Sequence, residues 1–288
     1  MSTTFPPFAA HETVRAAWRP SVLRLGLGRI LLEIKLFNRD VLSLVLVLFF
    51  PILMMSLFGT VFGDEPVFGA DPNGQGGITP AHYYLPGMLA LSTILSGFQN
   101  LSSYVATERF NGTVKRLAGT PLPAASYFIG KTGQTLYLIV AQTALLLLAA
   151  AVLFDVPLPR EAGQWGLMAL LMLLATAAWA TVAIAFTALP KSAQSASTLA
   201  VLPVLLLSFT SGVYFPFSQL PDWLQSISNF FPLRWTASAF RSVFLPAGFE
   251  AVEPGGTYNL PLTFLVLGLW VAAGAVVARL AFKWPPQK

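Results

Sequence analysis

The chain has 288 residues, of which 55% are hydrophobic and only 10% are charged, whereas a soluble domain carries about a quarter charged residues. This balance excludes an ordinary soluble domain and points to a membrane protein. The net charge of +5 is spread over several segments, which argues against a nucleic-acid surface, and the absence of cysteine excludes disulfides and thiol chemistry.

The chain is expected to begin with a loosely ordered cytoplasmic segment over residues 1–20, followed by a membrane domain over 21–288. Within 21–39, apolar residues recur at helical spacing, at Leu23, Leu27, Ile30, Leu31, Ile34 and Phe37. Cations cluster on an adjacent flank, at Arg24, Lys35 and Arg39. This pattern predicts an elbow helix lying in the membrane interface. The alternative, the start of the first span, would place Arg29 and Glu33 in hydrocarbon at considerable cost.

Apolar residues form six blocks that are each about 20 residues long, enough to cross a membrane as a helix. The predicted spans cover residues 41–62, 84–106, 133–154, 166–189, 198–217 and 261–282. Blocks of this length are too long for barrel strands, and in lipid a helix satisfies its own backbone. The sequence therefore predicts an all-α integral membrane fold with six transmembrane helices.

Lysine and arginine predict the orientation, because they concentrate on the cytoplasmic side of membrane proteins. With a cytoplasmic N-terminus, all of them lie in inside segments except Arg160, Arg234 and Arg241. We therefore expect a multi-pass protein of the cell membrane with both termini in the cytoplasm.

Two motifs resemble ligand sites but lack essential parts. Residues 130–132 read GKT, the end of a phosphate-binding loop, but the first glycine position of that motif is Ala125 and a membrane span follows. Lys131 is therefore expected to anchor the inside edge of the membrane. The loop at 71–82 resembles the start of a calcium loop, but His82 replaces the bidentate glutamate. We predict no catalytic residue, no metal site and no cofactor on this chain.

The predicted spans hold no ionisable side chain except Arg279 near the inside end. A proton- or sodium-coupled carrier normally needs such a group in mid-membrane. The energy for transport is therefore expected to come from a partner. A stand-alone carrier or channel, and a membrane scaffold or sensor subunit that moves nothing, are the alternatives.

Between the second and third spans lies a polar island on the cytoplasmic side, whose charged residues are Glu108, Arg109, Lys115 and Arg116. Gly112 and Pro121 bracket about two helical turns, and the spacing of Phe110, Val114 and Leu117 gives this short helix an apolar edge. A solvated loop obeying the positive-inside rule would explain the cations, but neither the acid nor the apolar edge.

The segment from Glu108 to Pro121, ERFNGTVKRLAGTP, resembles the E-R-E-x-G-T-x-x-x-L-x-x-T-P segment of type-2 ABC exporter permeases. Phe110 stands where that family usually has glutamate. Residues 211–241 resemble the outside re-entrant segment of the same family, which includes drug-resistance, lipo-oligosaccharide and polysaccharide exporters. The six spans, the elbow helix and the cytoplasmic ends also match.

The resemblance implies a permease subunit without a nucleotide site of its own. Two copies, or one copy with a related permease, would form the pathway, and two cytoplasmic ABC ATPase subunits would bind ATP and Mg. Coupling to the ATPase would fall to the coupling segment, by which we mean residues 108–117 and in particular Glu108, Arg109, Gly112, Thr113, Arg116 and Leu117. The outside re-entrant gate would include Phe215, Pro216, Pro221, Trp223 and Pro232.

The sequence indicates the residues that would contact a cargo less clearly. Polar residues that could line a path are Gln99, Asn100, Ser103, Thr210 and Ser211. Such residues can equally bond their own helix or join helices to each other. Because the spans carry few charges and aromatics make up 13% of the chain, we expect export of an amphipathic or hydrophobic drug, lipid or glycolipid.

Overall fold

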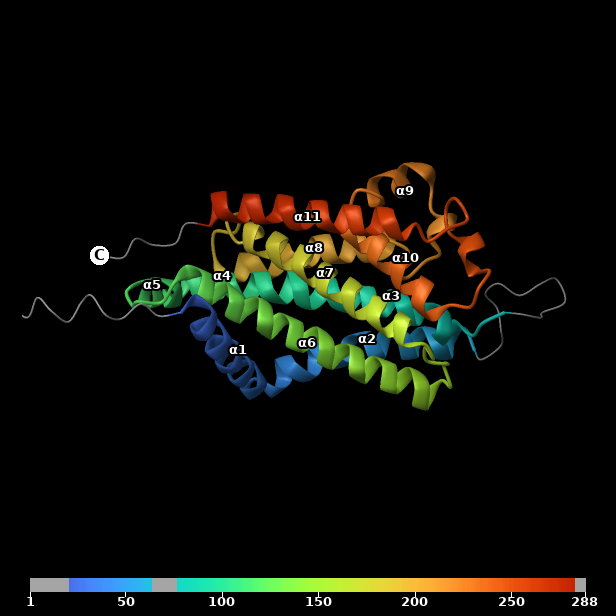
Figure 1. Cartoon of the computed structure of the whole chain (residues 1–288), viewed down its shortest axis with the longest axis horizontal. Helices are drawn as coiled ribbons and strands as arrows, with labels where there is room; N and C mark the ends of the chain where they lie inside the picture. Colours follow the sequence, from blue (N-terminus) through green and yellow to red (C-terminus); the bar gives the residue numbers. More distant parts are fainter. Residues whose placement is uncertain (1–20, 64–76, 283–288) are drawn as a thin grey trace, which may run out of the picture.

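The computed structural model describes residues 21–63 and 77–282 (Figure 1). The predicted cytoplasmic segment at 1–20 and most of the calcium-like loop at 71–82 lie outside the described residues.

In the described parts of the chain the regular elements are helices, so the all-helical fold is confirmed. The α-helices are α1 (Val22–Arg39), α2 (Val41–Val61), α3 (Pro80–Ile94), α4 (Leu101–Phe110), α5 (Thr113–Ala118), α6 (Ala124–Leu153), α7 (Ala162–Phe186), α8 (Ala193–Thr210), α9 (Asp222–Ser228), α10 (Pro232–Phe244) and α11 (Leu260–Ala281). A π-helix, η1 (Leu95–Asn100), joins α3 to α4, and the short 3-10 helices are η2 (Phe217–Gln219) and η3 (Phe249–Val252).

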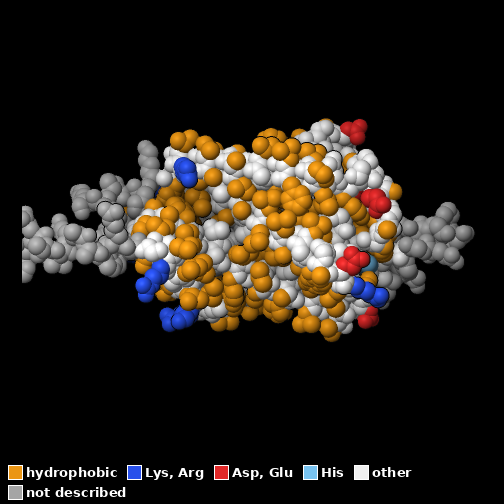
Figure 2. Space-filling model, in the orientation of Figure 1, with side chains coloured by type: hydrophobic (Ala, Val, Ile, Leu, Met, Phe, Trp, Pro, Cys, Tyr) orange, Lys and Arg blue, Asp and Glu red, His pale blue; other side chains and the backbone are white. Residues whose placement is uncertain are grey.

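Five of the described helices are long and apolar enough to cross a membrane: α2, α6, α7, α8 and α11. The predicted span at 84–106 is a continuous helical run that η1 divides, so that α3 and α4 are each shorter than a span. The sixth crossing stays a prediction. Figure 2 shows a broad hydrophobic band between two ends where charged side chains gather, as expected for a bundle that crosses a membrane.

Helix α3 lies at the centre of the bundle, and all of its residues are buried. It packs against α2, α6, α7 and α10. By contrast, α2 and α11 turn most of their apolar side chains outward. The core is thus built around the interrupted helix, while the outer helices present an apolar surface suited to lipid or to another subunit.

Two helix boundaries differ most from the predicted spans. Helix α6 begins at Ala124 rather than near 133, because its polar first turns pack against α1 and are covered by protein. Helix α8 ends at Thr210 rather than near 217. Gly212 follows with a φ of +78°, a left-handed conformation that ends the helix and that glycine adopts without strain.

Helix α1 has the bounds predicted for the elbow helix and packs closely against α6. Glycines make this approach possible: a Cβ atom at Gly26 would lie 2.7 Å from Ile129, and Cβ atoms at Gly130 and Gly133 would collide with Arg29 and Ile30. Small residues at such contacts let two helix backbones approach. Gly130 of the GKT motif therefore serves helix packing, and it brings α1 within reach of Lys131. The position of α1 in the membrane interface stays a prediction.

Candidate functional site

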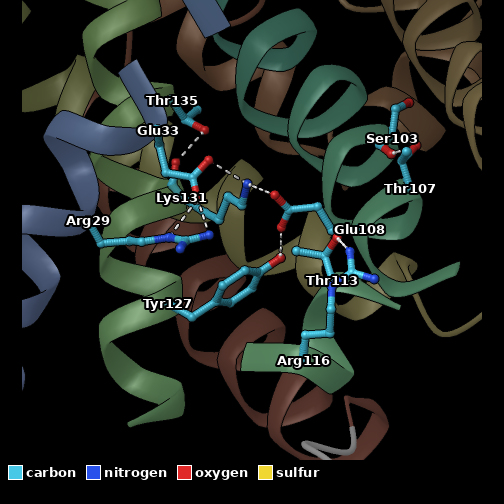
Figure 3. Close-up of polar contacts among 10 residues, drawn as sticks. All are labelled: Arg29, Glu33, Ser103, Thr107, Glu108, Thr113, Arg116, Tyr127, Lys131 and Thr135. Carbon is cyan, nitrogen blue, oxygen red and sulfur yellow. Dashed lines mark hydrogen bonds and ion pairs between the residues drawn. The ribbon is translucent and has the colours of Figure 1, made fainter. Parts of the chain in front are cut away.

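Where α1, α4 and α6 meet, five side chains form what we call the inner ion network: Arg29, Glu33, Glu108, Tyr127 and Lys131 (Figure 3). The Lys131 ammonium lies 2.6 Å from Glu33 Oε2 and 2.7 Å from Glu108 Oε1. Arg29 pairs with Glu33 at 2.7 Å, and the Tyr127 hydroxyl donates to Glu108 at 2.7 Å. Two cations therefore balance two carboxylates.

Lys131 is completely buried and lies at the centre of this network. Its ammonium is also 4.2 Å from the centre of the Tyr104 ring, which is a cation–π distance. The sequence led us to expect a lysine at the inside edge of the membrane. The structure instead places it between the elbow helix and the start of the coupling segment, where removing one partner would leave a buried charge uncompensated.

The coupling segment turns sharply between α4 and α5. Gly112 has a φ of +75°, and a left-handed conformation of this kind favours glycine. The Arg116 guanidinium donates to Thr113 Oγ1 at 3.0 Å and reaches back to the Asn111 carbonyl. These bonds stabilise the turn before α5, which lies at one end of the bundle (Figure 1). The short helix lies between Gly112 and Pro121, as the sequence predicts.

The two charged residues that open the coupling segment already have partners within the chain. Glu108 belongs to the inner ion network, and Arg109 donates to the Thr187 carbonyl at 2.6 Å. Thr187 is the C-cap of α7, where a cation is favoured by the helix dipole. The segment is thus tied to α1, α6 and α7. Arg109 and Arg116 remain exposed at the surface, whereas Leu117 is half-buried and Val114 is buried.

A half-open cavity of about 790 Å³ lies between α2, α8 and the interrupted helix. Three of the five polar residues proposed for a path line it, Gln99, Asn100 and Ser103, whereas Thr210 and Ser211 do not. Gln99 and Asn100 belong to η1, and π-helical turns of this kind are frequent at functional sites. The described residues that line the cavity are all uncharged, and apolar side chains from α2 and α8 dominate.

The segment predicted to lie outside holds a second buried group of charges, which we call the outer ion network: Arg234, Arg241 and Glu253. Arg241 and Arg234 lie 2.6 and 2.8 Å from the two Glu253 oxygens. Burial raises the pKa of Glu253, but attraction by Arg241 and Arg234 outweighs it, and the net result is a lowered pKa. Arg241 also donates to the Gly212 carbonyl.

The residues proposed for the outside gate are spread over several elements. Pro216 precedes η2, Pro221 is the N-cap of α9 and Pro232 begins α10. Phe215 and Trp223 are exposed, by 50% and 65%. The sequence reasoning missed the pairing with Glu253, although arginines in an apolar segment were a signal that buried partners must exist.

Comparison with known proteins is consistent with this arrangement. Residues 30–245 match the model of the ABC-2 type transporter family. The inner membrane transport permease YadH of Escherichia coli K12 is 24% identical over 220 residues, which cover 75% of this chain and 81% of the relative. Nodulation protein J of Sinorhizobium fredii is 29% identical over 239 residues, which cover 78% and 82%. The chain therefore belongs to the ABC-2 type transporter family and is a membrane subunit of a transporter.

Proposed function

We propose that this chain is the membrane-spanning permease of an ATP-binding cassette exporter and moves an amphipathic or hydrophobic cargo out of the cytoplasm. ATP and Mg would be bound by separate ATPase subunits, two per complex. The observation that carries the proposal is the inner ion network. It ties the coupling segment, which lies at one end of the bundle (Figure 1), to two helices that a moving partner would have to displace.

The contacts of the coupling segment suggest how work from the ATPase enters the membrane. A push on α5 reaches α7 through Arg109 and reaches α1 and α6 through Glu108 and Lys131. Packed helices and ion pairs of this kind hold one of two arrangements rather than deforming continuously. ATP binding would therefore shift the permease between an arrangement open to the cytoplasm and one open to the outside.

The cavity suggests the chemistry of the cargo. Apolar walls from α2 and α8 suit acyl chains or rings, and the amides of Gln99 and Asn100 can bond hydroxyl or amide groups. Since the described lining is uncharged, an uncharged polar head fits better than a free ion. The relatives include a protein named as an inner membrane transport permease, which supports a transport role in the cell membrane.

A second permease would complete the pathway. The cavity is half-open, and apolar side chains of α2 and α8, among them Phe49, Phe50 and Leu205, are exposed at its edge. A second copy of this chain, or a related permease, would cover that edge and enclose the cargo. Both termini are proposed to lie in the cytoplasm, on the side of the coupling segment.

To test the function, the chain would be purified with the soluble ABC ATPase of a neighbouring reading frame and reconstituted in liposomes. We expect stable co-purification and ATP hydrolysis that rises with amphipathic compounds. Transport without any ATPase would support the carrier or channel alternative. Hydrolysis that responds only to small inorganic ions would also contradict the proposal.

The coupling role has a sharper test within the same complex. The double variant Glu108→Ala, Arg109→Ala is expected to insert and assemble but to lose transport or to hydrolyse ATP without transport. The charged residue Lys115, on the same segment, offers a matched control in Lys115→Ala. Full transport by the assembled double variant would contradict the proposed coupling role of Glu108 and Arg109.

A further inference from the structure

Helix α2 contains a proline, Pro51, in its interior. Proline has no backbone N–H, so the carbonyl four residues earlier, that of Val47, loses its helical donor. In the hydrocarbon part of a membrane no water can replace that donor, and another protein group must satisfy the carbonyl.

Gln142 of α6 supplies the missing hydrogen bond. Its side chain is fully buried, and its Nε2 donates to the Val47 carbonyl. Its Oε1 accepts from the Ser96 hydroxyl at 3.1 Å. Ser96 belongs to the π-helix η1, so one amide connects the proline position of α2 with the irregular turn of the central helix.

Both ends of this connection lie at the wall of the cavity. Val47 lines it from α2, and Leu95 and Gln99, on either side of Ser96 in η1, line it from the central helix. Gly97 lets η1 sit close to α7, since a Cβ there would lie 2.8 Å from Trp179 Cβ. The central helix is thus held from behind by α7, and the distance across the cavity depends on where α2 is held.

We propose that Gln142 is a positioning residue that sets the shape of the cavity by holding α2 at the carbonyl freed by Pro51 against η1. Its importance for transport rests on the proposed function, in which the cavity receives the cargo. Its effect on the geometry of the cavity does not, because it follows from hydrogen bonds within this chain.

The test uses the lack of cysteine in the chain. Ser56 lines the cavity from α2 beyond Pro51, and Ser56→Cys provides a single reporter whose rate of labelling by N-ethylmaleimide is measured in detergent. Gln142→Met keeps the size of the side chain but removes both hydrogen bonds. The effect of Gln142→Met on the labelling rate is measured in the native background and in a Pro51→Ala background. Pro51→Ala restores a backbone N–H that can donate to the Val47 carbonyl.

Gln142→Met is expected to change the labelling rate severalfold in the native background and much less with Pro51→Ala, each relative to its own parent. The matched control is Thr143→Val, since the buried Thr143 hydroxyl has no hydrogen-bond partner among the described residues. An unchanged rate in Gln142→Met, an equal change in both backgrounds, or the same change in Thr143→Val would overturn the proposal.

If Gln142→Met fails to fold, the yield of monodisperse protein replaces the labelling rate as the readout. Recovery of the yield by Pro51→Ala supports the proposal, and failure in both backgrounds overturns it. The measurement needs neither ATPase nor cargo, so it can fail while the proposed function stands, and the function can fail while Gln142 keeps its role.

Discussion

The inner ion network depends on Lys131, because its ammonium lies between the carboxylates of Glu33 and Glu108. In the sequence this lysine completes GKT and is expected to anchor the membrane edge. In the structure it is fully buried and pairs with two carboxylates, one from α1 and one from α4. Its energetic role follows from burial, because a charge removed from water is tolerated only while its partners remain.

Lys131→Met is therefore expected to destabilise the chain by about 3–5 kcal/mol, the usual cost of breaking a buried ion pair by removing one partner. The apparent melting temperature in detergent, followed by size-exclusion chromatography, would report it. Lys115→Met, at an exposed lysine of α5, serves as the control and should change little. Equal melting temperatures for the native chain and Lys131→Met would show that the network contributes nothing to stability.

The four charged residues of the inner ion network could be named individually from the sequence, but Tyr127 and the pairing could not. Glu33 and Lys131 are separated by 98 residues, and a spacing rule reaches only within one helix. Glu108 was expected to face the ATPase because the coupling segment resembles a family motif. The structure shows that its carboxylate already has Lys131 and Tyr127 as partners, so any contact with an ATPase would compete with this network or act through it.

At the scale of elements, apolar runs predicted the long helices well, because length and hydropathy decide membrane helices almost alone. They failed where tertiary contacts override hydropathy. The start of α6 is polar but helical because α1 covers it, and the apolar residues after Gly212 leave the helix because of its left-handed turn. The π-helix η1 left no signal in the periodicity of the sequence.

Helix α1 provides a matched pair of glycines for testing its contact with α6. A Cβ at Gly26 would lie 2.7 Å from Ile129, whereas one at Gly28 meets no atom within 4 Å. Gly26→Leu should push α1 away from α6 and lower the melting temperature, since overpacking typically costs about 1–3 kcal/mol. Gly28→Leu should be neutral or slightly stabilising, because glycine is a poor helix former. Similar melting of the two variants would mean that α1 is not held by this contact.

The two ends of α5 offer a second matched pair of glycines, Gly112 and Gly119. Gly112 has a φ of +75°, and within the described part of the chain the only neighbour within 4 Å of a Cβ there is Arg116, at 3.9 Å. Replacing Gly112 by alanine is therefore expected to strain the backbone alone, by about 1–2 kcal/mol. Gly119, the C-cap at the other end of α5, has a φ of −75°. Gly112→Ala should reduce the transport obtained per ATP hydrolysed, and Gly119→Ala should not. Native coupling in an assembled Gly112→Ala complex would contradict a role for this turn.

At the scale of the whole molecule, each end of the apolar bundle carries a buried ion network. The inner network joins the coupling segment to α1 and α6, and the outer one joins α10 to the loop before α11. Charges of this kind are costly in the hydrocarbon band, so we expect the two networks to lie near its edges. An exporter that opens alternately at its two ends would have to loosen these networks in turn, and they can be perturbed separately.

The outer network can be perturbed through pH. Because the pKa of Glu253 is lowered in the folded chain, its pairing with Arg234 and Arg241 contributes stability that is fully present above the unfolded pKa of about 4.3 and is lost as pH falls through the folded pKa. Glu253→Gln should therefore lower the melting temperature at pH 7. The difference from the native chain should shrink as the pH falls below about 4.3, measured in detergent between pH 7 and pH 3.

Glu250→Gln is the matched control for this experiment, because Glu250 lies in η3 just before Glu253. Among the residues that the structure describes, its side chain accepts a hydrogen bond only from the backbone N–H of Gly248. Its difference from the native chain should stay smaller than that of Glu253→Gln at pH 7. A difference between Glu253→Gln and the native chain that grows on acidification would reverse the expected sign. In that case the carboxylate of Glu253 would be tolerated rather than stabilising, and the outer end of the bundle would be held by packing alone.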